Sequence, residues 1–322
     1  SVMDKISIIV PCYNEEKALP GFYRETADAV KDIEGAECEF IFVDDGSQDH
    51  TPDILESLSC MDDRCRYISF SRNFGKEAAM YAGLQNSSGD YCVFMDADLQ
   101  HPPKLLKEMY RVVKTEGYDC CAGLREDRTG ESKMRSLLSR AFYKIIKRIC
   151  NLDMGDGKGD FRMMSRTMAD SILELREYNR YMKGIFSFVG FDTKWIPFHN
   201  VERTAGETKW SFRSLMHYAV DGILSFSSAP ATMAGTAGVV LILAAVLTAV
   251  CTALFSGSLS GITLLICLVL LLNGIQMFFI SVLGQYVSKD YMESKKRPIY
   301  IVKKKRGFSE LSGEHQAGYR TV

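Results

Sequence analysis

Short apolar runs alternate with amphipathic stretches from the start of the chain to about residue 210. Four runs have the length of buried strands: 6–10, 39–43, 67–70 and 91–95. Four stretches carry apolar residues at helical spacing: 19–33, 51–58, 76–85 and 105–115. Pro52 suits the first turn of the second helix. Strands that alternate with helices predict an α/β domain with a mostly parallel, Rossmann-like sheet covered on both faces.

Acidic residues cluster where two of the predicted strands end. Asp44 and Asp45 follow the second strand, and Asp96 and Asp98 follow the fourth. Parallel sheets bind ligands beyond the carboxyl ends of their strands, so we expect a site at this edge. Taken alone, Asp96 and Asp98 are also compatible with a solvated turn, and Asp44 and Asp45 with a simple turn that caps a helix.

A basic amphipathic helix is predicted at 133–150, where apolar residues recur at helical spacing and the opposite face carries only lysine and arginine as charged residues. This pattern is typical of a helix on an anionic membrane surface, although an ordinary helix packed on the core accounts for it too. A juxtamembrane amphipathic helix is predicted at 211–228. The helix at 133–150 belongs to the domain 1–210.

The composition changes within 229–284. Residues 231–255 and 262–284 carry no charge, and each is long enough to cross about 30 Å of hydrocarbon. Their short connection predicts a two-helix transmembrane hairpin. Lysines and arginines are frequent in 285–322 and absent from the connection between the two helices. This asymmetry predicts that 285–322 is a basic cytoplasmic tail. It also places the domain 1–210 and both termini on the cytoplasmic side of the cell membrane. The cluster 303–306 is a further candidate for binding acidic lipid head groups.

Charge and cysteine usage exclude other classes of protein. The net charge is -1, which argues against a nucleic-acid partner, since nucleic-acid-binding domains are usually basic. The ten cysteines contain no Cys-x-x-Cys pair, so neither a zinc site nor a disulfide framework is expected.

The acidic clusters suggest distinct chemistry. Asp96 and Asp98 are hard oxygen ligands that suit Mg²⁺ or Mn²⁺ shared with a diphosphate, where the metal acts as a Lewis acid. Asp44 and Asp45 are placed to accept hydrogen bonds from a base or a ribose, and Gly46 permits the tight turn that follows.

Three segments together resemble family 2 glycosyltransferases of the GT-A fold: Val10–Glu16, Val43–Ser47 and Met95–Pro103. Their order and spacing match the family, in which the first two segments line the nucleotide pocket and the third binds metal and diphosphate. The resemblance implies that ten residues contact a nucleotide-diphosphate sugar: Pro11, Tyr13, Asn14, Glu15, Asp44, Asp45, Lys76, Asp96, Ala97 and Asp98.

Three further segments resemble the polyprenyl-phosphate branch of that family: Ser71–Ala79, Gly159–Arg166 and Arg203–Trp210. This branch includes bactoprenol glucosyltransferases and dolichol-phosphate mannose synthases, and some members carry His-Gln where Lys76 and Glu77 stand here. The predicted hairpin and the segment 291–300 resemble the bactoprenol type. The resemblance implies inverting transfer of a hexose from a nucleotide sugar, with UDP-glucose favoured, to undecaprenyl phosphate at the cytoplasmic membrane face. N-acetylglucosamine, galactose and mannose from GDP-mannose stay open as alternatives.

Asp160 matches the acidic position of the family and is the expected catalytic carboxylate, acting either as a base or as an orienting group. Its alternative is a helix cap before Phe161, with Asp153 and Asp156 as the next candidates. Cations are needed to offset the repulsion between two phosphate groups. Four candidates for binding phosphate or acceptor are Arg125, Arg135, Arg203 and Lys209. The resemblance also implies a homo-oligomer, with a tetramer as one candidate. A non-catalytic scaffold that binds nucleotide sugars at the bilayer is the competing class, which loss of these acids would have favoured.

Overall fold

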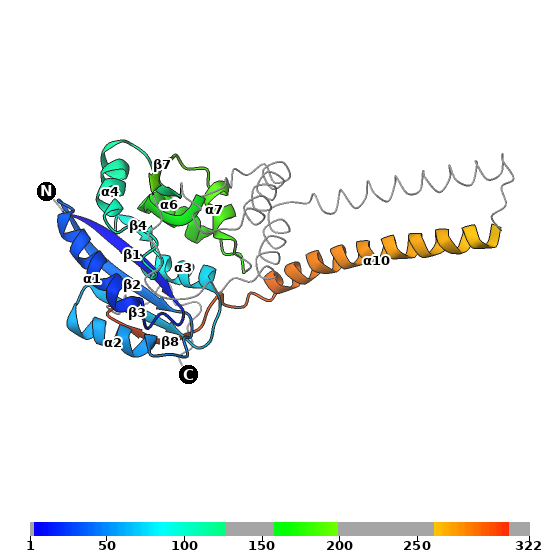
Figure 1. The fold of residues 1–322 in the computed structure, drawn as a ribbon, viewed down its shortest axis with the longest axis horizontal. Helices are drawn as coiled ribbons and strands as arrows, with labels where there is room; N and C mark the ends of the chain where they lie inside the picture. Colours follow the sequence, from blue (N-terminus) through cyan, green and yellow to red (C-terminus); the bar gives the residue numbers. More distant parts are fainter. Residues whose placement is uncertain (1–2, 126–157, 179, 199–260, 309–322) are drawn as a thin grey trace. The chain divides into compact units, whose positions relative to one another are not determined.

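The computed structural model describes residues 3–125, 158–178, 180–198 and 261–308 (Figure 1). Within these residues, eight strands form one sheet in the order β7-β5-β6-β4-β1-β2-β3-β8. Their bounds are β1 Asp4–Cys12, β2 Ala36–Asp44, β3 Cys65–Phe70, β4 Tyr91–Phe94, β5 Cys120–Arg125, β6 Lys158–Ser165, β7 Thr193–Phe198 and β8 Val302–Arg306.

The centre of the sheet is parallel and its flanks are mixed. Strands β4, β1, β2 and β3 run parallel, and β5 runs parallel to β7. Strand β6 lies antiparallel between β4 and β5, and β8 is antiparallel to β3. The predicted α/β architecture with a parallel core is confirmed, and two strands from later in the chain, β6 and β8, join the sheet in the opposite direction.

The helices before residue 120 match the predicted elements closely. The described helices of this domain are α1 Leu19–Ala29, α2 Thr51–Met61, α3 Lys76–Gln85, α4 Leu105–Thr115, α6 Arg166–Glu174 and α7 Met182–Phe188. The first helix was expected to reach residue 33; instead it ends at Ala29 and continues as the 3-10 turn η1, Val30–Asp32. Pro52 lies in the first turn of α2, as predicted.

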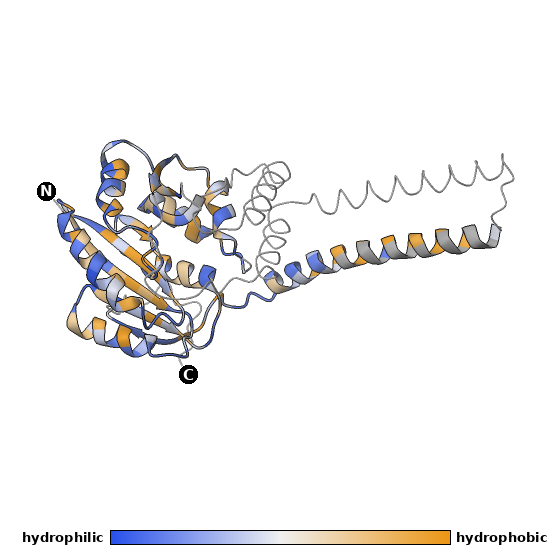
Figure 2. Cartoon of the chain, viewed as in Figure 1, coloured by the Kyte–Doolittle hydropathy of each residue, from blue (hydrophilic) through white to orange (hydrophobic). Residues whose placement is uncertain are grey.

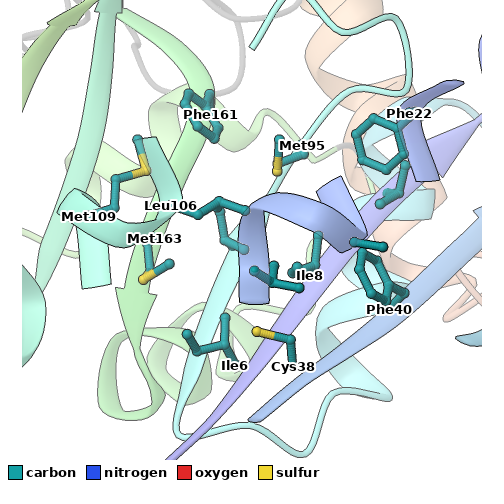
Figure 3. Packing of buried hydrophobic residues seen from close by; sticks show 14 of the residues in the cluster. Ile6, Ile8, Phe22, Cys38, Phe40, Met95, Leu106, Met109, Phe161 and Met163 are labelled. Carbon is teal, nitrogen blue, oxygen red and sulfur yellow. The ribbon is translucent and has the colours of Figure 1, made fainter. Parts of the chain in front are cut away.

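The two faces of the sheet are covered by different helices. Ile6 and Ile8 of β1 point to the face where Phe22 of α1 and Leu106 of α4 complete a buried cluster (Figure 3). Helix α3 packs on β1 and β2. A Cβ added at Gly83 of α3 would lie 2.2 Å from Ile9 Cγ2, so glycine allows this helix to approach the sheet closely. Figure 2 shows the apolar residues concentrated along the central strands.

The predicted basic tail at 285–322 contains a strand of the sheet. Strand β8 pairs with β3, and residues 298–308 belong to the same compact unit as the sheet. Lys304 Nζ and Arg306 Nη1 lie 2.8 and 3.3 Å from the carboxylate of Glu56 on α2. Residues 302–306 are therefore a strand of the domain and not the predicted tail. Pairing with the open edge of β3 and ion pairs with Glu56 hold this segment on the domain. Its contact with lipid head groups stays a prediction.

Helix α10, Gly261–Ser294, belongs to a second compact unit and contains the predicted span 262–284. Leu265, Leu271, Ile280 and Leu283 of this helix are exposed. Within the described ranges, no helix is both long enough and apolar enough to count as a membrane span. The helices predicted at 133–150, 211–228 and 231–255 lie outside the described residues.

Candidate active site

The loops that carry the predicted motifs meet at one edge of the sheet. Because β1, β2, β3 and β4 are parallel, their carboxyl ends lie at the same edge, where Cys12 is opposite Asp44 and Asp44 is opposite Ser69. The segments 13–18, 45–50, 71–75 and 95–104 leave the sheet there. The strand pairing thus brings the loops of the predicted motifs to one edge of the sheet, where the site was expected.

Lys76 lies between two carboxylates at this edge. Its Nζ is 2.7 Å from Asp96 Oδ1 and 3.0 Å from Asp160 Oδ2. Asp96 follows β4, whereas Asp160 lies on β6, so the contact joins residues far apart in sequence. Phe94 pairs with Arg162 in the antiparallel register of β4 and β6. Continuing this register by two residues brings Asp160 opposite Asp96.

Asp160 is therefore a strand residue, and the alternative that it caps a helix is wrong. Asp153 and Asp156 lie outside the described residues. The side chain of Asp160 is 19% exposed, and its Oδ1 atom is buried without a hydrogen-bond partner among the described residues. One oxygen of this carboxylate is thus held by Lys76, and the other, although buried, lacks a donor within the described part of the chain.

The electrostatics of this cluster favour ionised carboxylates. Burial favours the neutral acid, but the charges of Lys76, Lys183 and Arg162 outweigh it and hold the pKa of Asp160 below its usual value. Burial and Lys76 oppose each other in the same way at Asp96, whose pKa is also lowered. Burial disfavours the ammonium of Lys76, but the two carboxylates prevail and raise its pKa. At neutral pH the cluster is one ammonium between two carboxylates.

His101 supports this cluster and was not among the predicted site residues. The backbone N–H of Asp96 donates to His101 Nδ1 at 3.3 Å, and the ring stacks on Phe161 with centroids 4.7 Å apart. Burial lowers the pKa of His101, so the ring is neutral and Nδ1 is an acceptor. The signal that could have identified it is its place in the segment Met95–Pro103, which the resemblance already contained.

Asp96 and Asp98 provide hard oxygen ligands for a divalent cation. Among the described residues, no group of three or more His, Cys, Asp or Glu side chains is arranged to hold a metal. Asp98 Oδ1 accepts a hydrogen bond from Gln100 N at 3.1 Å, and Leu99 between them has a positive φ of 57°. Ala97, which separates the two acids, is buried. Two carboxylates fit an ion such as Mg²⁺ or Mn²⁺ whose remaining ligands are phosphate oxygens and water.

A pocket of about 470 Å³ lies at the same edge of the sheet, at the ends of β2 and β3. Tyr13, Asp44 and Arg72 are among the residues that line it. Asp44 accepts hydrogen bonds from Ser69 Oγ at 2.6 Å and Ser47 N at 2.9 Å, so its carboxylate also fixes the pocket wall. Pockets of this size suit small polar ligands such as nucleosides.

Other predicted nucleotide contacts connect the loops of the site. Asn14 N donates to Ser47 Oγ at 2.9 Å with φ at 53°, and Glu15 N donates to Thr51 Oγ1 at 2.8 Å. Pro11 lies within β1, opposite Val43. These contacts tie the end of β1 to the start of α2.

Asp45 holds the loop before α3. Its two oxygens accept hydrogen bonds from Phe74 N at 2.6 Å and Gly75 N at 2.9 Å. Burial outweighs these bonds and raises the pKa of Asp45 to about 6. Since Gly75 immediately precedes Lys76, Asp45 positions the lysine that contacts Asp96 and Asp160.

Of the four predicted phosphate-binding cations, only Arg125 lies among the described residues. Arg125 ends β5, where it lies opposite Phe198 of β7. Arg135, Arg203 and Lys209 lie outside the described residues. The structure therefore brings together Lys76, Asp96 and Asp160, and it leaves the predicted contribution of the four cations untested.

Comparisons with known proteins identify the family of the chain. Residues 7–173 match the family model described as glycosyl transferase family 2. The chain is 41% identical over 302 residues to the putative glycosyltransferase CsbB of Bacillus subtilis (strain 168), covering 92% of this chain and 91% of that protein.

Proteins named as bactoprenol glucosyl transferases are similar too. The prophage bactoprenol glucosyl transferase homolog of Escherichia coli (strain K12) is 37% identical, with 93% of this chain and 99% of that protein covered. The bactoprenol glucosyl transferase of Shigella phage SfV is 36% identical, with 94% of this chain and 99% of that protein covered. Among solved structures, glucosyl-3-phosphoglycerate synthase from Mycobacterium tuberculosis in complex with Mn²⁺ and UDP-glucose has a TM-score of 0.48 at 17% identity, covering 69% of this chain and 77% of that one.

Proposed function

The chain belongs to glycosyltransferase family 2, and we propose that it transfers glucose from UDP-glucose to a polyprenyl phosphate, giving polyprenyl-phosphate glucose, in keeping with its similarity to bactoprenol glucosyl transferases. The observation that carries the proposal is the contact of Lys76 with both Asp96 and Asp160 at the carboxyl edge of the sheet. This arrangement gathers a cation and two acids at the edge of the sheet that also carries a pocket of nucleoside size.

The transfer is a single displacement that inverts the anomeric carbon. An oxygen of the acceptor phosphate forms a bond to C1 of glucose, while the bond from C1 to the β-phosphate oxygen breaks and its electron pair leaves with UDP. A phosphate monoester has a second pKa near 6, so the acceptor is largely ionised at neutral pH. The attacking oxygen therefore needs no strong base.

Asp160 acts as an orienting group in this mechanism. The cations around it lower its pKa, which makes it a poor proton acceptor at neutral pH. Its Oδ1 atom, buried and without a partner among the described residues, is suited to accept a hydrogen bond from a hydroxyl of the sugar. Such a bond would fix C1 in line with the acceptor oxygen.

Charge at the reacting phosphates is offset by cations. Lys76 supplies one beside Asp96. Asp96 and Asp98 would hold Mg²⁺ or Mn²⁺, which when bound acts as a Lewis acid that stabilises the departing diphosphate. Arg125, Arg135, Arg203 and Lys209 are proposed to contact the phosphates of donor and acceptor.

The proposed acceptor also explains the apolar segments of the chain. A polyprenyl chain stays in the bilayer, so its phosphate is reached only by an enzyme at the membrane surface. We assign 231–255 and 262–284 to a hairpin in the cell membrane and 133–150 to its cytoplasmic surface. A homo-oligomer, with a tetramer as one candidate, completes the proposal.

A donor panel tests the assignment. The purified full chain in nanodiscs that contain undecaprenyl phosphate is incubated with Mg²⁺ or Mn²⁺ and one of UDP-glucose, UDP-N-acetylglucosamine, UDP-galactose or GDP-mannose. We expect glycolipid from UDP-glucose at a rate about tenfold or more above the others. The Asp160→Asn variant in the same nanodiscs is the control for transfer at this site. Faster transfer from another donor would overturn the choice of glucose.

A further inference from the structure

Strand β8 carries a β-bulge beside the pocket of about 470 Å³ at the ends of β2 and β3. Ser69 of β3 pairs with Lys304, but its neighbour Phe70 pairs with Val302, which leaves Lys303 as an extra residue. Consecutive side chains of a regular strand point to opposite faces, whereas a bulge redirects one of them. In agreement, Lys303 and Lys304 both line the pocket although they are adjacent in sequence.

The two lysines differ in their partners. Lys304 Nζ lies 2.8 Å from Glu56 Oε2, and Arg306 also contacts this carboxylate, so Glu56 is neutralised by its own neighbours. Lys303 is exposed and forms no ion pair or hydrogen bond with the described part of the chain. Its ammonium is the pocket-lining lysine that remains available to a ligand.

The donor's nucleoside is the part that this pocket can receive. Lys76, Asp96, Asp98 and Asp160 are not among the residues that line it. A diphosphate bound at Asp96 and Asp98 therefore leaves the base and ribose to occupy the pocket. A lysine here meets a neutral base, to which it offers three donors and no acceptor.

We propose that Lys303 recognises the base of the donor by donating a hydrogen bond to the carbonyl oxygen that uracil has and cytosine lacks, and so favours uracil over cytosine. Uracil has a carbonyl acceptor at the position where cytosine carries an amino donor, and an ammonium cannot pair with an amino donor. The bulge in β8 places the lysine for this contact. The inference rests on the proposed function, because it takes the pocket ligand to be the nucleoside of a nucleotide sugar.

Binding of free nucleotides tests the inference separately from transfer. Isothermal titration of the full chain in detergent with Mg²⁺ measures the affinity for UDP and for CDP, in the wild type, in Lys303→Gln and in Lys305→Gln. Lys305 is a matched control on the same strand, since it bonds Asn86 Oδ1 at 2.6 Å and does not line the pocket. We expect Lys303→Gln to weaken UDP binding roughly five- to tenfold, to change CDP binding less than about twofold, and Lys305→Gln to change neither.

The possible outcomes separate the two proposals. Unchanged UDP affinity in Lys303→Gln, or equal weakening of UDP and CDP, would overturn the role of Lys303 in reading the base while leaving the proposed transfer intact. A UDP-selective loss in Lys303→Gln would support that role even if the wild type failed to form glycolipid, a failure that counts against the acceptor. A wild type that binds neither nucleotide would overturn both.

Discussion

Replacing Lys76 with glutamine removes the ammonium that contacts both Asp96 and Asp160. A hydrogen bond between charged groups contributes roughly 1.5–3 kcal/mol to the free energy of unfolding, so two such bonds would contribute at most about 3–6 kcal/mol. The side chains of Lys76 and Asp96 are 37% and 34% exposed, and water screens such pairs. We therefore expect Lys76→Gln to lower the free energy of unfolding by about 1–3 kcal/mol.

The pH dependence of this loss follows from the shifted pKa values. Asp160 has a lowered pKa, so its contribution to stability is present above its ordinary value near 4 and is lost only as pH falls below it. Lys76 has a raised pKa, so its contribution is present below about pH 10 and is lost as pH rises further. The stability difference between wild type and variant should be largest between about pH 5 and 9.

Two assays measure the consequences of Lys76→Gln. Thermal unfolding of the full chain in detergent should show a melting temperature lower by about 2–12 °C, at roughly 2–4 °C per kcal/mol. The transfer rate should fall about tenfold or more, and its pH profile should gain an acid limb, because Asp160 beside Asp96 without a cation has a higher pKa. Lys107→Gln, at an exposed position on α4, is the control. Wild-type kcat and melting temperature in Lys76→Gln would refute this account of the cluster.

Other substitutions test separate parts of the site. Asp98→Ala should lower transfer about a hundredfold or more while the chain still fractionates with membranes, and a fully active variant would refute the metal-binding role of this acid. Gly46→Ala should destabilise the domain by about 1–3 kcal/mol, because the φ of Gly46 is +70° and the new Cβ would lie 2.5 Å from the carbonyl carbon of Arg72. An unchanged melting temperature would contradict this expectation. Because burial raises the pKa of Asp45 to about 6, its protonated form stabilises the fold below about pH 4 and this contribution is lost as pH rises to about 6. The melting temperature of the wild type relative to Asp45→Asn should therefore fall over that range, and a constant difference would count against the shift.

The local elements of the domain could be predicted because their signals are local. The strand ending at Cys12 and the helix beginning at Thr51 follow from apolar runs, turn residues and Pro52. The acidic clusters at Asp44 and Asp96 also follow, because parallel strands place their carboxyl ends together.

The contacts that complete the site depend on strand order, which a single sequence does not contain. Asp160 meets Asp96 only because β6 enters the sheet antiparallel beside β4. Lys303 reaches the pocket only because β8 returns to pair with β3 and is bulged there. The basic composition of 285–322 predicted a tail, since composition does not reveal that β3 offers an open edge with which 302–306 can pair.

Mass spectrometry of the lipid product tests the central claim most directly. The full chain in nanodiscs with undecaprenyl phosphate is supplied with isotope-labelled UDP-glucose and Mg²⁺ or Mn²⁺, and the extracted lipids are analysed beside those from Asp160→Asn. The account predicts labelled undecaprenyl-phosphate glucose from the wild type and a strongly reduced amount from the variant. Release of labelled free glucose and UDP without any labelled lipid would contradict it.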